Sequence, residues 1–281
     1  MERKIKKHWF LFLLPTLICF IIAFALPFIL GVGLSFTEFK TVTNSRFVGF
    51  QNYISIFKTS DEFISSLIFT VAFSIVTVVL VNLLAFFLAL TLVKRFPLRN
   101  FYRTIFFMPN LIGGIVLGYI FQLIINGVLL NYGYTITSKW TFGFWGLVVL
   151  SLWQMTGYMM VIYIAGLTSI PNQLYEAAKV DGANSFRSLI SITLPSVMPS
   201  ITVCLFLTIT NSFKMFDQNL ALTAGAPSGQ TEMLALDIYN TFYGRSGGEG
   251  IGQAKAVVFF IIVALISFIQ LKLTKSKEYE S

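Results

Sequence analysis

The sequence has 281 residues, of which 56% are apolar and only 11% are charged, and its mean hydropathy is +0.78. A soluble domain carries about 25% charged residues, so this composition excludes a soluble globular protein and predicts an integral membrane protein. The same composition excludes a disordered chain, and a content of two cysteines excludes a disulfide scaffold. The net charge of +8 would also fit a nucleic-acid-binding protein. The positions of the charged residues along the chain distinguish these two interpretations.

Six uncharged runs follow one another along the chain. A helix needs about 20 apolar residues to cross the hydrocarbon core of a bilayer, and the first five runs exceed this length. The sixth reaches it only if the helix begins near Ile251 and keeps Lys255 at the outer interface. We therefore expect an all-α membrane protein with six transmembrane helices, at residues 9–35, 66–93, 104–125, 144–166, 196–216 and 251–271.

The basic residues lie mainly on one side of these expected helices. Thirteen Lys and Arg residues lie in the segments that six spans would place on the same side as both termini, and seven lie on the other side. With the acidic residues included, the first side has the whole net charge of +8 and the second side is neutral. Because basic loops stay in the cytoplasm, both termini are expected to be cytoplasmic. The charge is thus a topology signal and not a nucleic-acid footprint. The segments of the basic side are the N-terminus and residues 94–103, 167–195 and 272–281.

Residues 3–25 allow another interpretation, because four basic residues, an apolar run and an Ala-Phe-Ala sequence resemble a secretory signal peptide. The apolar run continues to Thr37, which is too long for a signal peptide core. Cleavage would also leave five spans and put the termini on opposite sides. We therefore expect the segment to stay as the first span.

The sequence lacks the residues that several functions need. It has no Walker A sequence, so this chain is not expected to bind ATP through a P-loop. Its single histidine, His8, lies at the membrane edge, and no zinc or Ser-His-Asp set can be assembled. Few charges lie inside the spans, whereas proton- or ion-coupled carriers usually need some there. A passive channel or a transporter powered by another subunit remains.

The longest cytoplasmic loop, residues 170–195, has the pattern of two short helices. Pro171 suits the first turn of a helix, Gly182 suits a left-handed C-terminal cap, and Asn184 or Ser185 can cap a second helix. Pro195 is expected to end that helix and open the fifth span. By composition alone, the loop could be a membrane-surface linker.

The order of residues in this loop resembles a known signature. Glu-Ala-Ala, three residues, Gly, nine residues and Ile-x-Leu-Pro is typical of the permeases of binding-protein-dependent ABC importers, and the present chain matches it without a gap at Glu176, Ala177, Ala178, Gly182, Ile192, Leu194 and Pro195. Other segments resemble the carbohydrate permeases of the maltose and glycerol-phosphate type: FVGFQNY at 47–53, YRTIFFMP at 102–109, WQ at 153–154, LTAGAP at 222–227 and DIY at 237–239. Ala226 stands where the family commonly has glycine. No large extracellular domain is inserted between the spans.

The resemblance implies a single transmembrane domain over residues 1–281, with the first span and an extracellular loop at 1–65 and a five-span permease core at 66–273. It implies a bacterial cell membrane location, and a function as the permease subunit of an ATP-driven sugar importer rather than as an enzyme. The implied partners are a second, different permease chain, two ATPase subunits, an extracellular solute-binding protein, the sugar and membrane lipid. No cofactor is expected in this chain, since ATP and Mg would be bound by the ATPases.

In the family, the Glu-Ala-Ala loop is a coupling helix that docks into a groove of the ATPase. By resemblance, Glu176 would make charge-assisted contacts, Ala177 and Ala178 would allow close docking, and Gly182 would make the turn. Asp181, Leu194 and Pro195 complete the expected coupling residues. A bulky residue at Ala178 is expected to uncouple ATP hydrolysis from transport.

A sugar path needs polar groups and an aromatic face inside the membrane, and two stretches that line the sugar site in maltose-type relatives offer them here. Tyr158 could stack on a sugar ring, while Asn211 and other polar residues could bind hydroxyl groups. The alternative is that the polar residues bond neighbouring helices. The expected path residues are Gln154, Met155, Tyr158, Thr208, Asn211, Ser212 and Met215. A stand-alone channel or secondary carrier is the alternative function, followed by a membrane enzyme.

Overall fold

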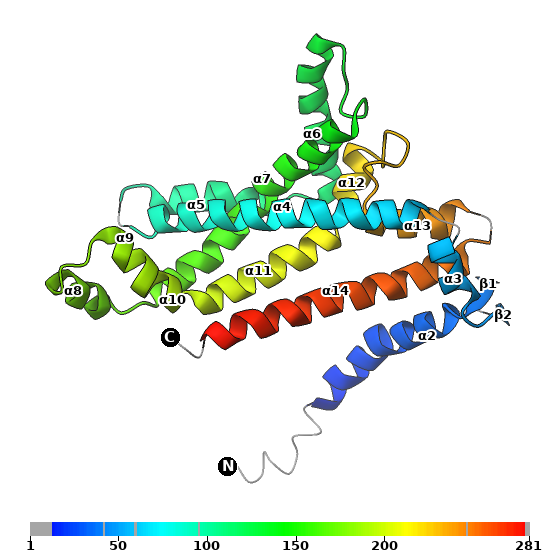
Figure 1. The fold of residues 1–281 in the computed structure, drawn as a ribbon, viewed down its shortest axis with the longest axis horizontal. Helices are drawn as coiled ribbons and strands as arrows, with labels where there is room; N and C mark the ends of the chain where they lie inside the picture. The colour runs from blue at the N-terminus through cyan, green and yellow to red at the C-terminus, as the bar shows by residue number, and fades with distance from the viewer. Residues whose placement is uncertain (1–12, 42, 59–60, 95, 246, 279–281) are drawn as a thin grey trace, which may run out of the picture. The chain divides into compact units, whose positions relative to one another are not determined.

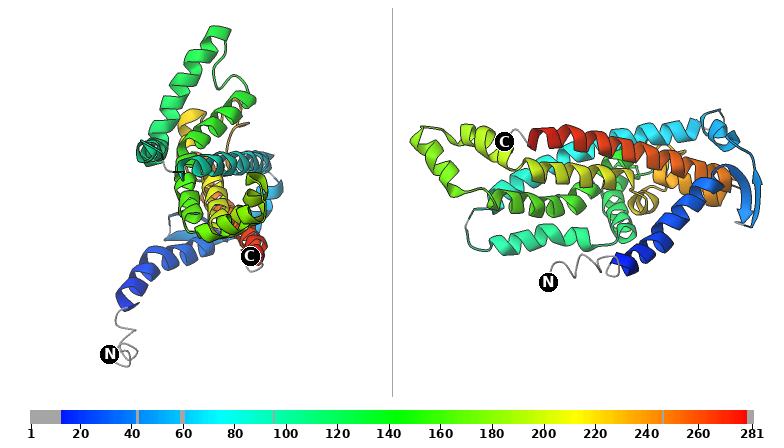
Figure 2. Two further views of the ribbon diagram at one scale, coloured as in Figure 1. Left: turned by 90° about the vertical axis from the view of Figure 1, so that its left-hand side faces the viewer. Right: turned by 90° about the horizontal axis from the view of Figure 1, so that it is seen from below.

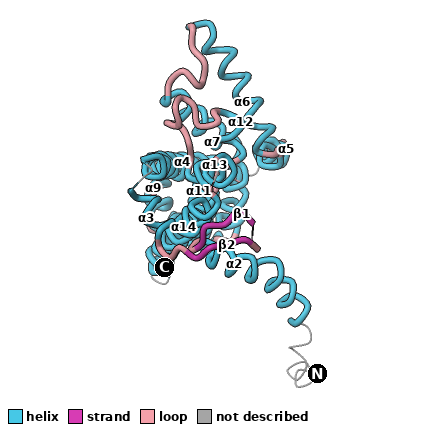
Figure 3. The backbone as a smooth tube through the Cα atoms, turned by 90° about the vertical axis from the view of Figure 1, so that its right-hand side faces the viewer, coloured by secondary structure: helices cyan, strands magenta, loops and turns pink. Residues whose placement is uncertain are grey.

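The computed structural model describes residues 13–41, 43–58, 61–94, 96–245 and 247–278. Most of these residues are helical, and the only strands among them form a two-stranded antiparallel sheet, drawn in magenta in Figure 3. The chain forms two compact units, and each is described by itself. The first consists of residues 1–61 and 238–260, and the second of residues 62–237 and 261–281.

The first unit begins with an apolar helix that is described from residue 13 and passes through a π-helical turn, η1 (Ile21–Ala25), into α2 (Leu26–Leu34). The hairpin of β1 (Thr37–Thr41) and β2 (Asn44–Phe47) follows, with Glu38 opposite Arg46. Strands were not expected in an all-α chain, and the short helix α3 (Gln51–Lys58) was not expected within the loop that follows the first span. The strands occupy a loop outside the predicted spans, where threonines and phenylalanines favour extended backbone.

Asn52 explains why the chain turns back on itself after the hairpin. Its side-chain amide donates to the carbonyl oxygens of Ser35 and Thr37, both at 2.9 Å. The first unit also contains parts of α13 (Leu234–Gly244) and α14 (Glu249–Glu278). Between these two helices, the fully buried Lys255 donates to the hydroxyl of Thr241 at 2.8 Å. A hydroxyl acceptor therefore lies next to its buried ammonium group, and the expected place of Lys255 at the outer membrane interface stays a prediction.

The second unit is built on three helices, α4 (Asp61–Leu92), α7 (Trp140–Thr168) and α11 (Met198–Phe213), which Figure 1 labels. All three contribute residues to one apolar cluster. Two apolar clusters form its core. One surrounds Met159, Val197 and Cys204, and the other surrounds Phe73 and Leu147. α7 supplies residues to both clusters, and two-thirds of its most apolar window is buried. It is therefore the central helix of the unit.

The predicted third span, residues 104–125, is not one helix. The structure has α5 (Arg99–Phe107), a 3-10 turn η2 (Met108–Leu111) and, after two extended residues, α6 (Gly114–Leu129). Pro109 lacks an amide hydrogen and Gly113 takes an extended backbone conformation, so an apolar run long enough for one helix is divided into two. α6 packs on α12 (Asp217–Leu222) and contacts α7, and its C-terminal end projects from the rest of the unit (Figure 2).

The predicted fifth span, residues 196–216, corresponds to one helix, α11 (Met198–Phe213), and the chain bends just before it, as expected from Pro195. The segment 185–196, made of α9 (Ser185–Ser188), the π-helical turn η4 (Leu189–Thr193) and α10 (Leu194–Ser196), meets α11 at an angle of 68°. Pro195 and Pro199 lie on the two sides of the break at Val197, and proline is the usual cause of such bends. Within the described residues, five helices could each cross a membrane, or six if this bent pair is one span.

Candidate functional site

The residues with the coupling signature form a helical hairpin at one end of the second unit (Figure 1). Pro171 is the N-cap of α8 (Asn172–Val180), and Gly182 follows the helix with a φ of +77°. The Asn184 side chain accepts a hydrogen bond from the amide of Arg187 at 2.8 Å and so caps α9. The predicted turn at Gly182 and the predicted cap at Asn184 are both confirmed, whereas Pro171 lies one position before the expected first turn.

Two contacts hold α8 against the segment that follows it. The hydroxyl groups of Tyr175 and Thr193 lie 3.0 Å apart, and the amide of Ala183 donates to the carbonyl of Ala178 at 2.8 Å. Tyr175 is half-buried and Thr193 is buried. One side of α8 is therefore fixed to the unit, and the other side is free to meet a partner.

The free side of the hairpin combines an acidic group with small and apolar ones. Glu176, Ala177, Asp181 and Gly182 are exposed, while the expected coupling residues Ala178, Leu194 and Pro195 are half-buried. The hairpin also presents apolar side chains to the outside, with Val180 88% exposed and Phe186 69% exposed. Leu174 and Ile190 are exposed as well. Exposed apolar side chains next to charged ones are typical of a protein-binding surface.

Most of the residues expected along the sugar path are buried and already bonded within the second unit. Gln154 donates to the carbonyl of Ile112 at 3.3 Å and accepts from Gln218 at 2.9 Å. Ser212 is fully buried and donates to the carbonyl of Thr208 at 2.7 Å. Met155 and Met215 are buried, and the hydroxyl of Ser151 lies 3.8 Å from the Met215 sulfur.

Thr208 belongs to a hydrogen-bonded group that sequence reasoning did not find. The Asn82 amide donates to the Thr208 hydroxyl at 3.2 Å, and the Asn82 oxygen accepts from the Tyr163 hydroxyl at 2.8 Å. Thr208 itself donates to the carbonyl of Cys204 at 2.6 Å. This Asn82–Tyr163–Thr208 group joins α4, α7 and α11. The only signal in the sequence was an asparagine in the middle of an apolar run, and such residues often bond neighbouring helices.

Tyr158 and Asn211 are the two expected path residues that are not buried. Tyr158 is half-buried, and its ring centroid lies 6.3 Å from that of Phe107. Asn211 is exposed near the end of α11. An aromatic face and a carboxamide of this kind can bind the ring and hydroxyl groups of a polar solute. Among the described residues, no group of three His, Cys, Asp or Glu side chains is placed to hold a metal ion.

The comparisons with known proteins agree on one family. The model of the "binding-protein-dependent transport system inner membrane component" family matches residues 81–277. The chain is 43% identical to the probable starch degradation products transport system permease protein AmyD of Thermoanaerobacterium thermosulfurigenes, over 97% of this chain and 95% of that protein. It is 32% identical to the trehalose/maltose transport system permease protein MalF of Thermococcus litoralis, over 95% of this chain and 93% of that protein.

A solved structure has the same fold. It is a chain of a bacterial ABC transporter involved in the import of the acidic polysaccharide alginate, with a TM-score of 0.81, 22% identity and coverage of 98% of both chains. The predicted resemblance is therefore confirmed, and the function is that of a transport permease subunit rather than an enzyme. The chain belongs to the family of inner membrane components of binding-protein-dependent transport systems.

Proposed function

We propose that this chain is the permease subunit of an ATP-driven sugar importer and that the exposed side of α8 docks a separate ATPase subunit. The observation that carries the proposal is the arrangement of α8, which is fixed on its Tyr175 side and presents Glu176 and Ala177 to the outside. Two small side chains allow a partner to approach the helix backbone, and a carboxylate gives that partner a charge-assisted contact. The names of the relatives, which refer to starch degradation products and to trehalose and maltose, support a carbohydrate as the solute.

The proposed complex contains a second, different permease chain, two ATPase subunits that bind ATP and Mg, and an extracellular solute-binding protein. A related structure is a bacterial alginate ABC transporter in complex with an alginate pentasaccharide-bound periplasmic protein. This chain itself needs no cofactor, and it contacts the sugar and the surrounding lipid. The helical bundles would rock as rigid bodies around a path at the membrane midplane. This movement would open the path alternately to the inside and to the outside of the cell.

We place six spans in a bacterial cell membrane, with the fifth formed by α11 (Met198–Phe213) after the bend and with both termini in the cytoplasm. The thirteen basic residues on the side of the termini support this orientation. Residues 1–281 then form one transmembrane domain, with the first span and outer loop at 1–65 and the permease core at 66–273. α8 lies on the cytoplasmic side in this topology, where an ATPase can reach it.

For the solute path, we propose that Tyr158 and Asn211 contact the sugar directly. The other five expected path residues are buried and would support the wall of the path without contacting the sugar: Gln154, Met155, Thr208, Ser212 and Met215.

The coupling proposal is tested by placing tryptophan on α8 in the assembled importer. Ala177→Trp adds bulk on the exposed side, and Ala178→Trp adds it at a half-buried position. Ser276→Trp is the matched control, because Ser276 is exposed on α14 and outside the hairpin. Both α8 variants are expected to lose ATP-dependent sugar uptake in vesicles while the control keeps it. Normal assembly and uptake with either α8 variant would contradict the proposed docking surface.

A further inference from the structure

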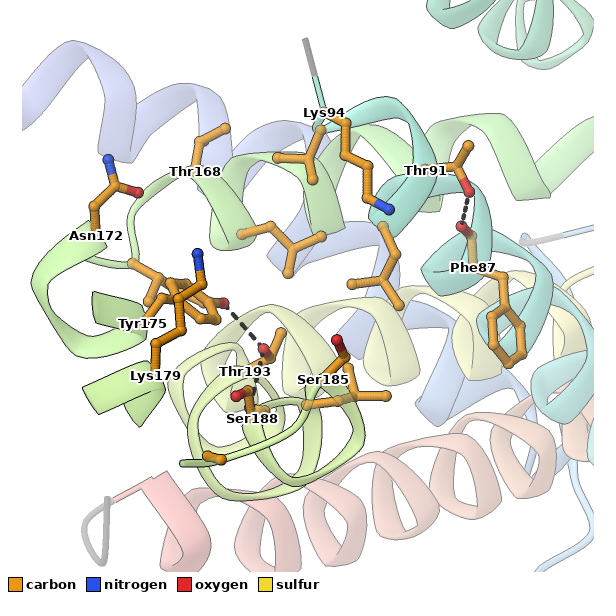
Figure 4. Close-up of a pocket in the computed structure, with 16 residues that line it drawn as sticks. Phe87, Thr91, Lys94, Thr168, Asn172, Tyr175, Lys179, Ser185, Ser188 and Thr193 are labelled. Atoms are coloured by element: carbon orange, nitrogen blue, oxygen red, sulfur yellow. Dashed lines mark hydrogen bonds between the residues drawn. The ribbon is translucent and has the colours of Figure 1, made fainter. Parts of the chain in front are cut away.

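A pocket of about 770 Å³ lies in the second unit, where α8 meets the ends of α4 and α7 (Figure 4). Its walls come from three places: the end of α4, the end of α7 and the segment from α8 to η4. None of the functions assigned above uses it. We call it the Lys94–Lys179 pocket, after the two charged residues that line it.

The charge of the pocket is of one sign. Lys94 lines the pocket from the end of α4 and Lys179 lines it from α8, as Figure 4 shows. Among the described residues that line the pocket, none is acidic. Both lysines are exposed. Two positive charges in one concave site raise the local concentration of anions.

Other polar groups that line the pocket are of the kind that bind anion oxygens. The Asn172 carboxamide and the hydroxyl groups of Ser185 and Ser188 line the same space. Hydroxyl, amide and ammonium groups all donate hydrogen bonds, and a phosphate has several oxygens to accept them. A phosphate monoester carries up to two negative charges and the phosphodiester of a lipid headgroup carries one, so the two lysines would attract either.

The remaining wall is apolar and belongs to the end of a membrane-spanning helix. Phe87, Leu90 and Val93 line the pocket at the end of α4. An anion held between the lysines would therefore have a polar end at the membrane surface and an apolar surface next to it. This is the environment of a phospholipid headgroup, and a soluble phosphate ester would meet the same donors.

We propose that the Lys94–Lys179 pocket binds a phosphate-bearing anion. The bound phosphate would link the end of α4 to α8 through one ammonium group from each, and so fix the coupling hairpin to the second unit. The proposal concerns binding only, and it holds whether or not α8 docks an ATPase. It is therefore tested on the full chain alone, so that its failure leaves the proposed docking surface untouched.

The test uses the full-length chain in a non-ionic maltoside detergent after removal of bound lipid. Its thermal unfolding is followed while inorganic phosphate or phosphatidylglycerol is added, with potassium chloride of equal ionic strength as the blank. A ligand that binds only the folded state raises the Tm by an amount that grows with the logarithm of one plus the ratio of the free ligand concentration to Kd. Each lysine near a membrane surface contributes about a fivefold gain in affinity for an anionic group, so Lys94→Gln with Lys179→Gln should weaken binding about 30-fold.

The matched control removes the same two charges elsewhere, by Lys272→Gln with Lys275→Gln on α14, both at exposed positions. This control is expected to bind with the affinity of the unchanged chain, and each single pocket variant to fall in between. A Tm response to inorganic phosphate assigns the site to soluble phosphate esters as well, and a response to phosphatidylglycerol alone assigns it to lipid headgroups. No response to either probe, or equal weakening in the pocket and control variants, would overturn the proposal. Equal Tm values of all variants without ligand verify that they fold.

Discussion

Gly182 gives the sharpest test of how the coupling hairpin is built. It follows α8 with a φ of +77°, and a Cβ atom placed on it would meet nothing within 4 Å. A side chain at this position is therefore opposed by the backbone conformation alone and not by packing. For an L-residue other than glycine or asparagine, the left-handed region costs about 1–2 kcal/mol, and a β-branched residue is among the worst.

Gly182→Val should consequently shift the local opening equilibrium of this turn by about 5- to 30-fold. The amides of residues 181, 182 and 183 report that opening, because they donate to the carbonyls of Ala177, Lys179 and Ala178. Hydrogen exchange of the purified chain, measured by mass spectrometry on peptides covering α8, should show faster exchange by this factor. Gly182→Asn should exchange almost as slowly as the unchanged chain, since asparagine tolerates the left-handed region.

Gly127 supplies the matched control. It lies inside α6, its φ is not positive, and a Cβ atom there also meets nothing within 4 Å. Gly127→Val should leave the exchange of α8 unchanged. Equal exchange rates at α8 in Gly182→Val and Gly182→Asn would refute the reasoning, because backbone conformation would then not be what limits this position.

Three other predictions concern the second unit. Tyr163→Phe removes the donor to Asn82 but keeps the ring contact with Phe86, so it should lower the stability in detergent by about 0.5–1.5 kcal/mol, seen as a lower Tm; an unchanged Tm would show that the Asn82 oxygen finds another donor. Gly157→Leu should reduce the yield of folded chain severely, since its Cβ would overlap the backbone carbonyl of Phe106, whereas Gly127→Leu should be tolerated. Asn211→Ala should raise the KM of sugar uptake with little change in Tm, because Asn211 is exposed. Thr208→Val should instead lower the Tm, because it loses the hydrogen bond to Asn82. The opposite pattern would assign the sugar contact to Thr208 and the structural role to Asn211.

The spans and the coupling hairpin were predictable because their signals are local. An uncharged run of span length, a glycine after a helix and an asparagine before the next one act through the backbone of their own neighbourhood. The interruption inside the third predicted span was harder to predict. Pro109 was visible, but proline is tolerated in membrane helices, so its presence alone does not decide whether a helix bends or ends. Here Pro109 and the extended backbone of Gly113 accompany the break, and α6 packs on α12.

The pocket and the polar group around Asn82 depend on contacts between distant parts of the chain. Lys94 follows α4 and Lys179 lies on α8, so only the packing of the unit brings them to one space. In the same way, the role of Thr208 was undecidable from its residue type. A hydroxyl in a span can face a solute or a neighbouring helix, and the position of Asn82 on another helix determines which.

The course of the chain suggests how the coupling hairpin and the proposed path are connected. α9, η4 and α10 lead directly into α11, and α11 is the helix that carries Thr208 and Asn211. The 68° bend at Val197 lies between the two parts. Val197 is fully buried in the cluster that also contains Met159 and Cys204, so the bend is held by the core of the second unit rather than exposed as a free hinge. A displacement of α8 by a partner would therefore act on a packed core with few alternative arrangements, and such a core transmits movement to α11 instead of absorbing it.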